Sequence, residues 1–382
     1  MQIVNLFLLV FTFLSFNAYS HHGMGTFDPT TDLVLTGVVT EIAMVNPHAF
    51  IYLEAVRDDG STVEPWRCEM RAATVLRRSG WTEELFLEGR ALTVEGIPDR
   101  EEPNTCYVAT VNFADGTSID RYQQLVDQEA VPTDRPLTLA DGTPNIFGYW
   151  AAEQRIGTDP RGRRGELVLL SEARALFEQG VSPSQNYLGM GSAMGMGMGR
   201  LPPGIEPTQA MLDSAKDFIY ERDMPRWHCS PTNIFFDWTF DSMTNEIILE
   251  DDKIIIKYGS FDLIRMVHMD QDNHPADLKL SKWGHSIGKW VDSNLVVDTI
   301  GFEPGYLFVP FMYSEAMHVV ETFSLDNDSA RLRRSWVATD SKNLVGEYTG
   351  SDEVLISSLP YEPYNCDDRS LSQNDEEFLR RL

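Results

Sequence analysis

Positive charge is scarce in this 382-residue sequence, which carries 31 Lys and Arg against 58 Asp and Glu and a formal net charge of −27. A chain with this imbalance is repelled by nucleic-acid phosphates and by anionic lipids, so we expect neither as a partner. Long hydrophobic runs are also scarce. After the first twenty residues, no segment approaches the ~20 apolar residues of a membrane-spanning helix, and we expect no membrane insertion of the mature chain.

Several catalytic signatures are absent as well. The sequence contains no Gly-x-Ser-x-Gly elbow, no phosphate-binding loop, no Gly-x-Gly-x-x-Gly after a strand and no His-Glu-x-x-His. Only four cysteines are present, and none forms a Cys-x-x-Cys pair, which argues against zinc ribbons and thioredoxin-type chemistry. We favour the bridges Cys68–Cys106 and Cys229–Cys366, because each then stays within one predicted domain; buried free thiols are the alternative.

The N-terminus has the features of an export signal. An apolar run over residues 3–14 is too short to span a bilayer, and Ala18-Tyr19-Ser20 has the small-x-small pattern that signal peptidase reads. No Lys or Arg precedes the run, which departs from the usual signal. We predict that residues 1–20 are a signal peptide and that the mature protein is periplasmic or secreted; an uncleaved anchor is the alternative.

The next hundred residues alternate apolar and polar side chains, which is typical of half-buried β-strands. A short helix is predicted over residues 72–80, where Gly80 ends it. Three strands, a helix and two strands are the element order of an OB-type barrel, so we predict an OB-like domain over residues 21–124. A linker rich in Asp, Pro and Thr follows over residues 125–144. The predicted strands cover residues 34–42, 49–56, 63–70, 90–96 and 107–113.

The second half is predicted to be a lipocalin-like antiparallel barrel over residues 145–370, with a few helices. Its strands are predicted at residues 246–249, 253–258, 263–268, 289–290, 294–299, 318–323 and 330–336. Helices are expected to start after Ser171 and after Thr208, the second running to Arg222. Between them, residues 189–199 form a Met- and Gly-rich insertion that we expect to be a loop. Residues 371–382 are predicted to be an acidic, polar tail.

Two stretches resemble known families. His21-His22, Asn46-Pro47-His48-Ala49 and the run from Leu76 to Trp81 resemble an uncharacterised family of bacterial periplasmic domains, over residues 21 to 120. The sequence departs from that family at Gly23-Met24, where serine and phenylalanine are usual. His274-Pro275-Ala276-Asp277, the run from Gly284 to Trp290 and His318-Val319-Val320-Glu321 resemble an uncharacterised exported family that is lipocalin-like. Neither resemblance implies an established activity.

The second half also gathers residues suited to acid–base chemistry and ligand binding. Strand periodicity limits which of them can meet, because neighbouring positions point to opposite faces. His318 and Glu321 should therefore face opposite ways, as should Arg265 and His268. Structural polar residues with no shared site are the alternative interpretation. The candidate catalytic residues are His285, His318, Asp298, Glu321 and Arg265, and the candidate ligand-binding residues are His268, His274, Trp283 and Trp290.

We therefore expect a small, largely apolar or aromatic molecule bound in the second barrel, with isomerase, lyase or cyclase chemistry or with binding alone. The alternative is a copper protein. Cleavage after Ser20 would make His21 the first residue, whose amine and imidazole can chelate copper together with His48 and neighbouring His22. The Met-rich loop would add soft thioether ligands for Cu(I). The sequence identifies no other cofactor and leaves the oligomeric state open.

Overall fold

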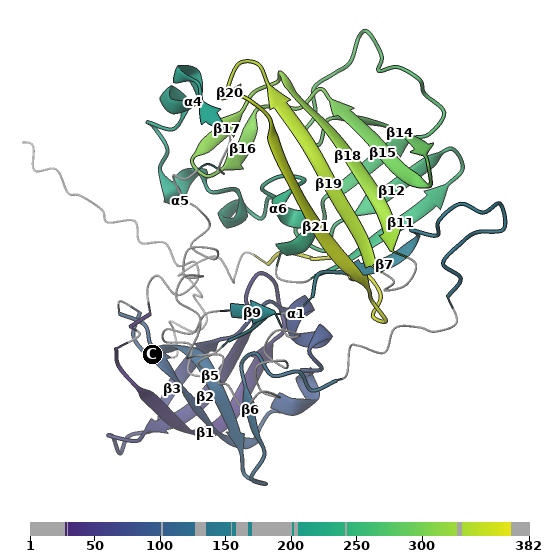
Figure 1. The fold of residues 1–382 in the computed structure, drawn as a ribbon. Coiled ribbons are helices and arrows are strands. Elements are labelled where there is room, and N and C mark those ends of the chain that lie inside the picture. The colour runs from purple at the N-terminus through teal and green to yellow at the C-terminus, as the bar shows by residue number, and fades with distance from the viewer. Residues whose placement is uncertain are drawn as a thin grey trace, which may run out of the picture.

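The structure is a computed structural model of the chain, and it consists of two β-barrels joined end to end (Figure 1). The predicted architecture of a small OB-like barrel followed by a larger barrel with few helices is confirmed. The expected signal peptide, the helix after Ser171, the Met-rich loop and the acidic tail lie outside the described residues. The structure describes residues 27–28, 30–100, 102–126, 135–153, 155–157, 167–169, 201, 205–240, 243–326 and 331–367.

The first barrel has the strand order of an OB fold. β1 pairs with both β2 and β4, while β3 and β5 pair in parallel and close the barrel. The helix α1 (Ala73–Arg78) and the 3-10 turn η2 (Glu83–Phe86) connect β3 to β4, as the OB order requires. The strands are β1 (Leu33–Ala43), β2 (Phe50–Arg57), β3 (Glu64–Glu69), β4 (Ala91–Pro98), β5 (Thr105–Phe113) and β6 (Ser118–Asp120).

A disulfide fastens the closure of this barrel. Cys68 on β3 lies opposite Cys106 on β5, and the two are bonded, as the sequence predicted. Around them Trp66, Trp81 and Phe86 are buried and form the centre of the domain's apolar core. The second predicted bridge, Cys229–Cys366, is also present.

Nine strands close the second barrel, and eight of the nine neighbouring pairs are antiparallel. The remaining pair, β13 and β14, is parallel at Val267–Ser286 and His268–Ile287. The end of β13 therefore meets the start of β14, and the intervening residues 269–284 form a loop outside the wall. In order around the barrel, the strands are β11 (Thr244–Glu250), β12 (Lys253–Lys257), β13 (Ile264–His268), β14 (His285–Val291), β15 (Asn294–Ile300), β18 (Met317–Asp326), β19 (Arg331–Asp340), β21 (Tyr348–Ile356) and β7 (Gly148–Ala151).

The remaining helices and strands are short and do not belong to the nine-stranded wall. The helix expected from Thr208 to Arg222 is wrong in extent: Thr208 does cap a helix, but α4 ends at Ser214. Only Met211 of α4 is buried, so tertiary packing does not sustain a longer helix. The short elements are β8 (Arg155–Gly157), β9 (Leu167–Leu169), β10 (Glu206–Pro207), α4 (Gln209–Ser214), α5 (Tyr220–Asp223), η4 (Pro225–His228), α6 (Phe236–Thr239), β16 (Gly305–Phe308), β17 (Phe311–Tyr313) and β20 (Leu344–Val345). Among the described residues, no helix has the length and apolar character needed to cross a bilayer.

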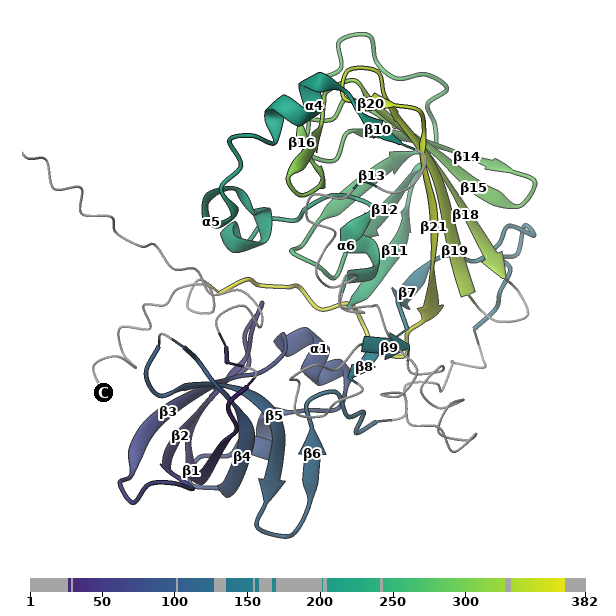
Figure 2. The ribbon, with the colours of Figure 1, turned by 60° about the vertical axis from the view of Figure 1, so that its left-hand side comes forward.

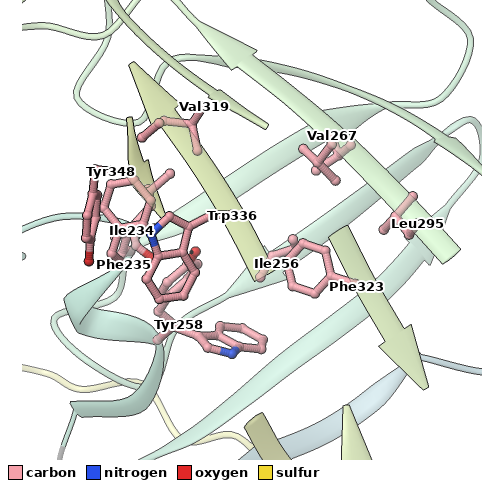
Figure 3. Close-up of a cluster of buried hydrophobic side chains, with 14 of the residues drawn as sticks. Ile234, Phe235, Ile256, Tyr258, Val267, Leu295, Val319, Phe323, Trp336 and Tyr348 are labelled. Carbon is pink, nitrogen blue, oxygen red and sulfur yellow. Dashed lines mark hydrogen bonds between the residues drawn. The ribbon is translucent and has the colours of Figure 1, made fainter. Parts of the chain in front are cut away.

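Large aromatic side chains and α6 fill one part of the second barrel (Figure 3). Phe235 packs on Trp336 and Tyr348, with ring centroids 5.4 and 5.3 Å away. Trp238 packs edge-on against Tyr258 and Phe323. The side chains that point inward therefore form a packed core through this region rather than lining an open channel.

The chain's last described segment, residues 357–367, runs between the two barrels (Figure 2). The Tyr364 ring lies 4.5 Å from that of Phe261 in the second barrel, while the Tyr364 carbonyl accepts a hydrogen bond from Asn46 in the first. The Asp367 amide donates to the Asn46 carbonyl at 2.8 Å. Arg78 of α1 also donates to the Ala152 carbonyl at 3.1 Å, so several hydrogen bonds join the barrels.

Candidate functional site

Strand periodicity separates the predicted site residues onto the two faces of the barrel wall. Arg265 and Glu321 point inward and are almost completely buried. His268 and His318, three residues away on the same strands, are only partly buried and belong to the outer face. The expected opposition within each pair is therefore what the structure shows. The five residues predicted as catalytic consequently do not meet at one site.

Four of the six described histidines gather on the outer wall with one aspartate. The His285 ring stacks on that of His268, with centroids 4.8 Å apart and planes 13° apart. Nδ1 of His274 lies 2.8 Å from Nδ1 of His285. Together with Asp298 and His318, these three residues form what we call the histidine cluster: His268, His274, His285, Asp298 and His318.

Asp298 joins two histidines of the cluster. Its Oδ1 lies 2.9 Å from Nε2 of His274, and its Oδ2 lies 3.0 Å from Nε2 of His318. An ionised carboxylate can only accept hydrogen bonds, so both imidazoles donate through Nε2. A continuous hydrogen-bonded path thus runs from His285 through His274 and Asp298 to His318, over three different strands and the loop between β13 and β14.

Two members of the cluster have shifted pKa values. Partial burial raises the pKa of Asp298, but the hydrogen bonds from His274 and His318 outweigh it and hold that pKa below its usual value. Burial lowers the pKa of His285, and the neighbouring His268 and His274 lower it further. Asp298 is therefore ionised near neutral pH, and His285 favours its neutral form there.

The inward-facing residues form a separate group, the interior ion network of Arg265, Glu321, Arg334 and Asp352. Glu321 accepts hydrogen bonds from Arg265 at 2.6 Å and from Arg334 at 3.3 Å, and Arg334 also pairs with Asp352. Burial raises the pKa of Glu321, but the two guanidinium groups outweigh it and keep that pKa below its usual value. The network is thus two positive charges neutralised by carboxylates within the core.

The interior ion network is hydrogen-bonded to β14 and β15, two of the strands that carry the histidine cluster. Arg265 donates to Thr299 at 3.2 Å and to Ser286 at 3.4 Å. Thr299 follows Asp298 in the chain, and Ser286 follows His285, so each hydroxyl lies directly behind a cluster residue. Arg265 therefore fixes β14 and β15 relative to β13 from the inside, and it holds the outer residues in register.

The two tryptophans predicted to bind ligand, Trp283 and Trp290, are half-buried and pack against the core of the second barrel. Neither has a described contact with the histidine cluster. A small cavity of about 70 Å³ lies elsewhere, between the barrels, where Arg77, Arg78 and Glu362 contribute to its lining. It contains none of the predicted site residues.

The predicted copper ligands are only partly visible. His21 and His22 lie outside the described residues. His48 lies on the first barrel, where its Nδ1 is 2.9 Å from Oε1 of Glu69 and its side chain is 21% exposed. Within the described ranges, no three His, Cys, Asp or Glu side chains already share the arrangement of a metal site.

Sequence reasoning did not identify Ser286, Thr299, Arg334, Asp352 or Tyr258 as partners of the predicted residues. Alternation along β15 and β19 places Thr299 and Arg334 on the inner face, so a signal was present for those two. Alternation along the strands could not predict the contact between His268 and His285, because that contact depends on the parallel pairing of β13 with β14.

The chain matches the sequence profile of a family of unknown function, DUF6152, over residues 10–107. This match confirms that the N-terminal region resembles an uncharacterised family, while the resemblance predicted for the second half stays a prediction. No curated protein and no solved structure matches the chain. The matched region includes His48 but none of the histidine cluster.

Proposed function

We propose that the histidine cluster is the functional site of an exported protein and that it performs acid–base chemistry on a small molecule. The observation that carries this proposal is the carboxylate of Asp298 held between two imidazoles on the outer wall. The two disulfides support maturation in an oxidising compartment, and the apolar N-terminus supports a periplasmic or secreted location.

His318 is the proposed proton-transfer group, because its side chain is 45% exposed and can meet a molecule from solvent. Its Nε2–H is held by Asp298, so Nδ1 of the neutral ring faces away from that bond and can accept a proton. The Asp298 carboxylate then stabilises the imidazolium. In an isomerisation, the proton taken from one atom of the bound molecule is returned to another, which needs no oxidant or reductant.

The surroundings favour an apolar or aromatic portion in that molecule. Asp298 lies opposite Val320, which lies opposite Val337, so an apolar strip extends across the outer wall from the carboxylate. Val337 is 41% exposed. Because packed aromatic side chains occupy much of the described barrel interior, we place the ligand on the outer wall rather than inside the barrel.

The proposal is tested by exposing the tag-free protein to a small-molecule extract of the organism that makes it, with products followed by mass spectrometry. We expect one compound to be converted, and we expect His318→Gln and Asp298→Asn to slow that conversion by about 10²–10⁴-fold. His228→Gln is the matched control, since His228 is an exposed histidine outside the cluster. Conversion at the wild-type rate by both cluster variants would reject the proposal.

A second candidate is copper binding at the N-terminus, and one observation favours it. A metal-binding imidazole commonly donates a hydrogen bond from its other ring nitrogen to a carboxylate. Nδ1 of His48 lies beside the Glu69 carboxylate in this way. His21 would supply the amine and a second imidazole after cleavage. The test compares the copper affinity of the protein that starts at His21 with that of a form carrying one added residue before His21. Equal affinities would reject this candidate.

A further inference from the structure

Two imidazole nitrogens face each other within the histidine cluster. His274 and His285 approach through Nδ1 at 2.8 Å, with ring planes 71° apart. A hydrogen bond between neutral imidazoles needs one protonated and one unprotonated nitrogen, so a single proton is shared at this contact. Because the same lone pairs bind metals, a cation can take the place of that proton.

The orientation of His274 already suits a metal ligand. Its Nε2–H is held by Asp298 at 2.9 Å, which leaves the lone pair of the neutral ring on Nδ1. Carboxylates that accept from the distal nitrogen of a histidine in this way fix the tautomer and raise the basicity of metal-binding imidazoles. Asp298 is thus placed to support a ligand rather than to be one.

A third imidazole lies beside the pair. His268 stacks on His285 at 4.8 Å, at the point where β13 and β14 run in parallel, so both rings project from the same part of the wall. Three imidazoles with one position open to water are a common ligand set of zinc and other late transition metals. His318 is bound to the far oxygen of Asp298 and lies on the other side of the carboxylate.

His274 and His285 need only a small movement to share a metal ion, whereas the His268 ring must turn out of its stack on His285 to reach the same ion. Two nitrogens at ~2.05 Å from a tetrahedral ion are about 3.3 Å apart, whereas the Nδ1 atoms of His274 and His285 are separated by 2.8 Å. His274 lies in the loop between β13 and β14, so its ring can shift without breaking a strand pair. The strongly acidic chain also draws cations toward its surface.

We propose that His268, His274 and His285 bind one divalent transition-metal ion, with Zn²⁺ as the best-fitting case, and that Asp298 positions His274. This site does not involve the N-terminal histidines. It lies in the same histidine cluster as the proposed acid–base site, but His318 is not one of its ligands. A metal here would supply a Lewis acid or a bound water on the His274 side of the Asp298 carboxylate.

The test is isothermal titration of the tag-free, chelator-treated full protein with Zn²⁺ in excess Mg²⁺, which masks non-specific attraction to acidic side chains. We expect one Zn²⁺ per chain. His274→Gln and His285→Gln should each weaken binding by more than the ~10–100-fold expected for Asp298→Asn, because a ligand matters more than its supporting carboxylate.

His318→Gln and His48→Gln are the matched controls, and both should keep the wild-type Zn²⁺ affinity. The inference is overturned if the wild-type protein takes up no Zn²⁺ under these conditions, or if His274→Gln and His285→Gln bind it as wild type does. Loss of binding in His48→Gln alone would assign the metal to the N-terminal site instead. These outcomes concern binding only, so they are distinguishable from failure of the acid–base proposal, which depends on His318.

Discussion

At the scale of single residues, His285 is a histidine whose surroundings oppose its charge. Partial burial, His268 and His274 all lower its pKa below the usual value of about 6.5. Further along the hydrogen-bonded path, Asp298 is held in the charged form by the imidazoles of His274 and His318. The cluster therefore keeps a neutral imidazole and an anionic carboxylate within one hydrogen-bonded path at neutral pH.

This arrangement predicts how stability depends on pH. The unfolded state binds a proton at His285 more readily than the folded state, so the contribution of the neutral ring is complete above about pH 6.5 and is lost as the pH falls toward the folded pKa. NMR titration of histidine ring protons should place the His285 transition below those of an unfolded control. A transition above about pH 6.5 would contradict the assignment.

At the scale of elements, the interior ion network links β13, β18, β19 and β21. Glu321→Ala leaves Arg265 without its carboxylate inside the core, whereas Arg334 keeps Asp352. Removing one partner of a buried pair typically costs about 3–5 kcal/mol, because the remaining charge is buried unpaired. We expect a loss of that size in urea denaturation followed by tryptophan fluorescence.

The control for this prediction is Glu353→Ala on β21. Glu353 pairs with Arg331 and Arg333 at the surface, where its side chain is 43% exposed, and such pairs contribute at most about 1 kcal/mol. If Glu321→Ala and Glu353→Ala lower the free energy of unfolding equally, the interior ion network contributes no more to stability than the surface pair.

The same strands show what the sequence could and could not predict. Alternation on β13 and β18 was enough to place Arg265 and Glu321 opposite His268 and His318, because side-chain direction on a strand is set locally. The contact between His268 and His285 was not predictable in this way. It depends on β14 lying parallel to β13, and a pattern of hairpins led to the expectation of antiparallel neighbours throughout.

At the scale of the whole molecule, one disulfide and the segment 357–367 tie the second barrel to the first. Cys229–Cys366 closes a separation of 137 residues, and the Asp367 amide next to it donates to Asn46 of the OB-like barrel. In the chain-entropy view, a closed loop of this size stabilises the folded state by up to about 5 kcal/mol.

Replacing both Cys229 and Cys366 by serine should therefore lower the melting temperature and speed hydrogen exchange in the peptide over residues 357–367. The Cys68→Ser/Cys106→Ser double variant is the comparison, because its bridge lies wholly within the first barrel. Exchange in residues 357–367 that is unchanged by loss of Cys229–Cys366 would show that this bridge does not hold the segment against Asn46.

The central claim is that Asp298 couples two histidines of the outer wall, and nitrogen-15 NMR of the imidazole rings tests it most directly. In the wild-type protein, both His274 and His318 should carry their proton on Nε2 at neutral pH. Asp298→Asn should shift the ring signals of both, since an amide offers only one acceptor oxygen, and should leave His48 and His228 unchanged. If the substitution leaves either His274 or His318 unaffected, the carboxylate does not join them and the account of the site is wrong.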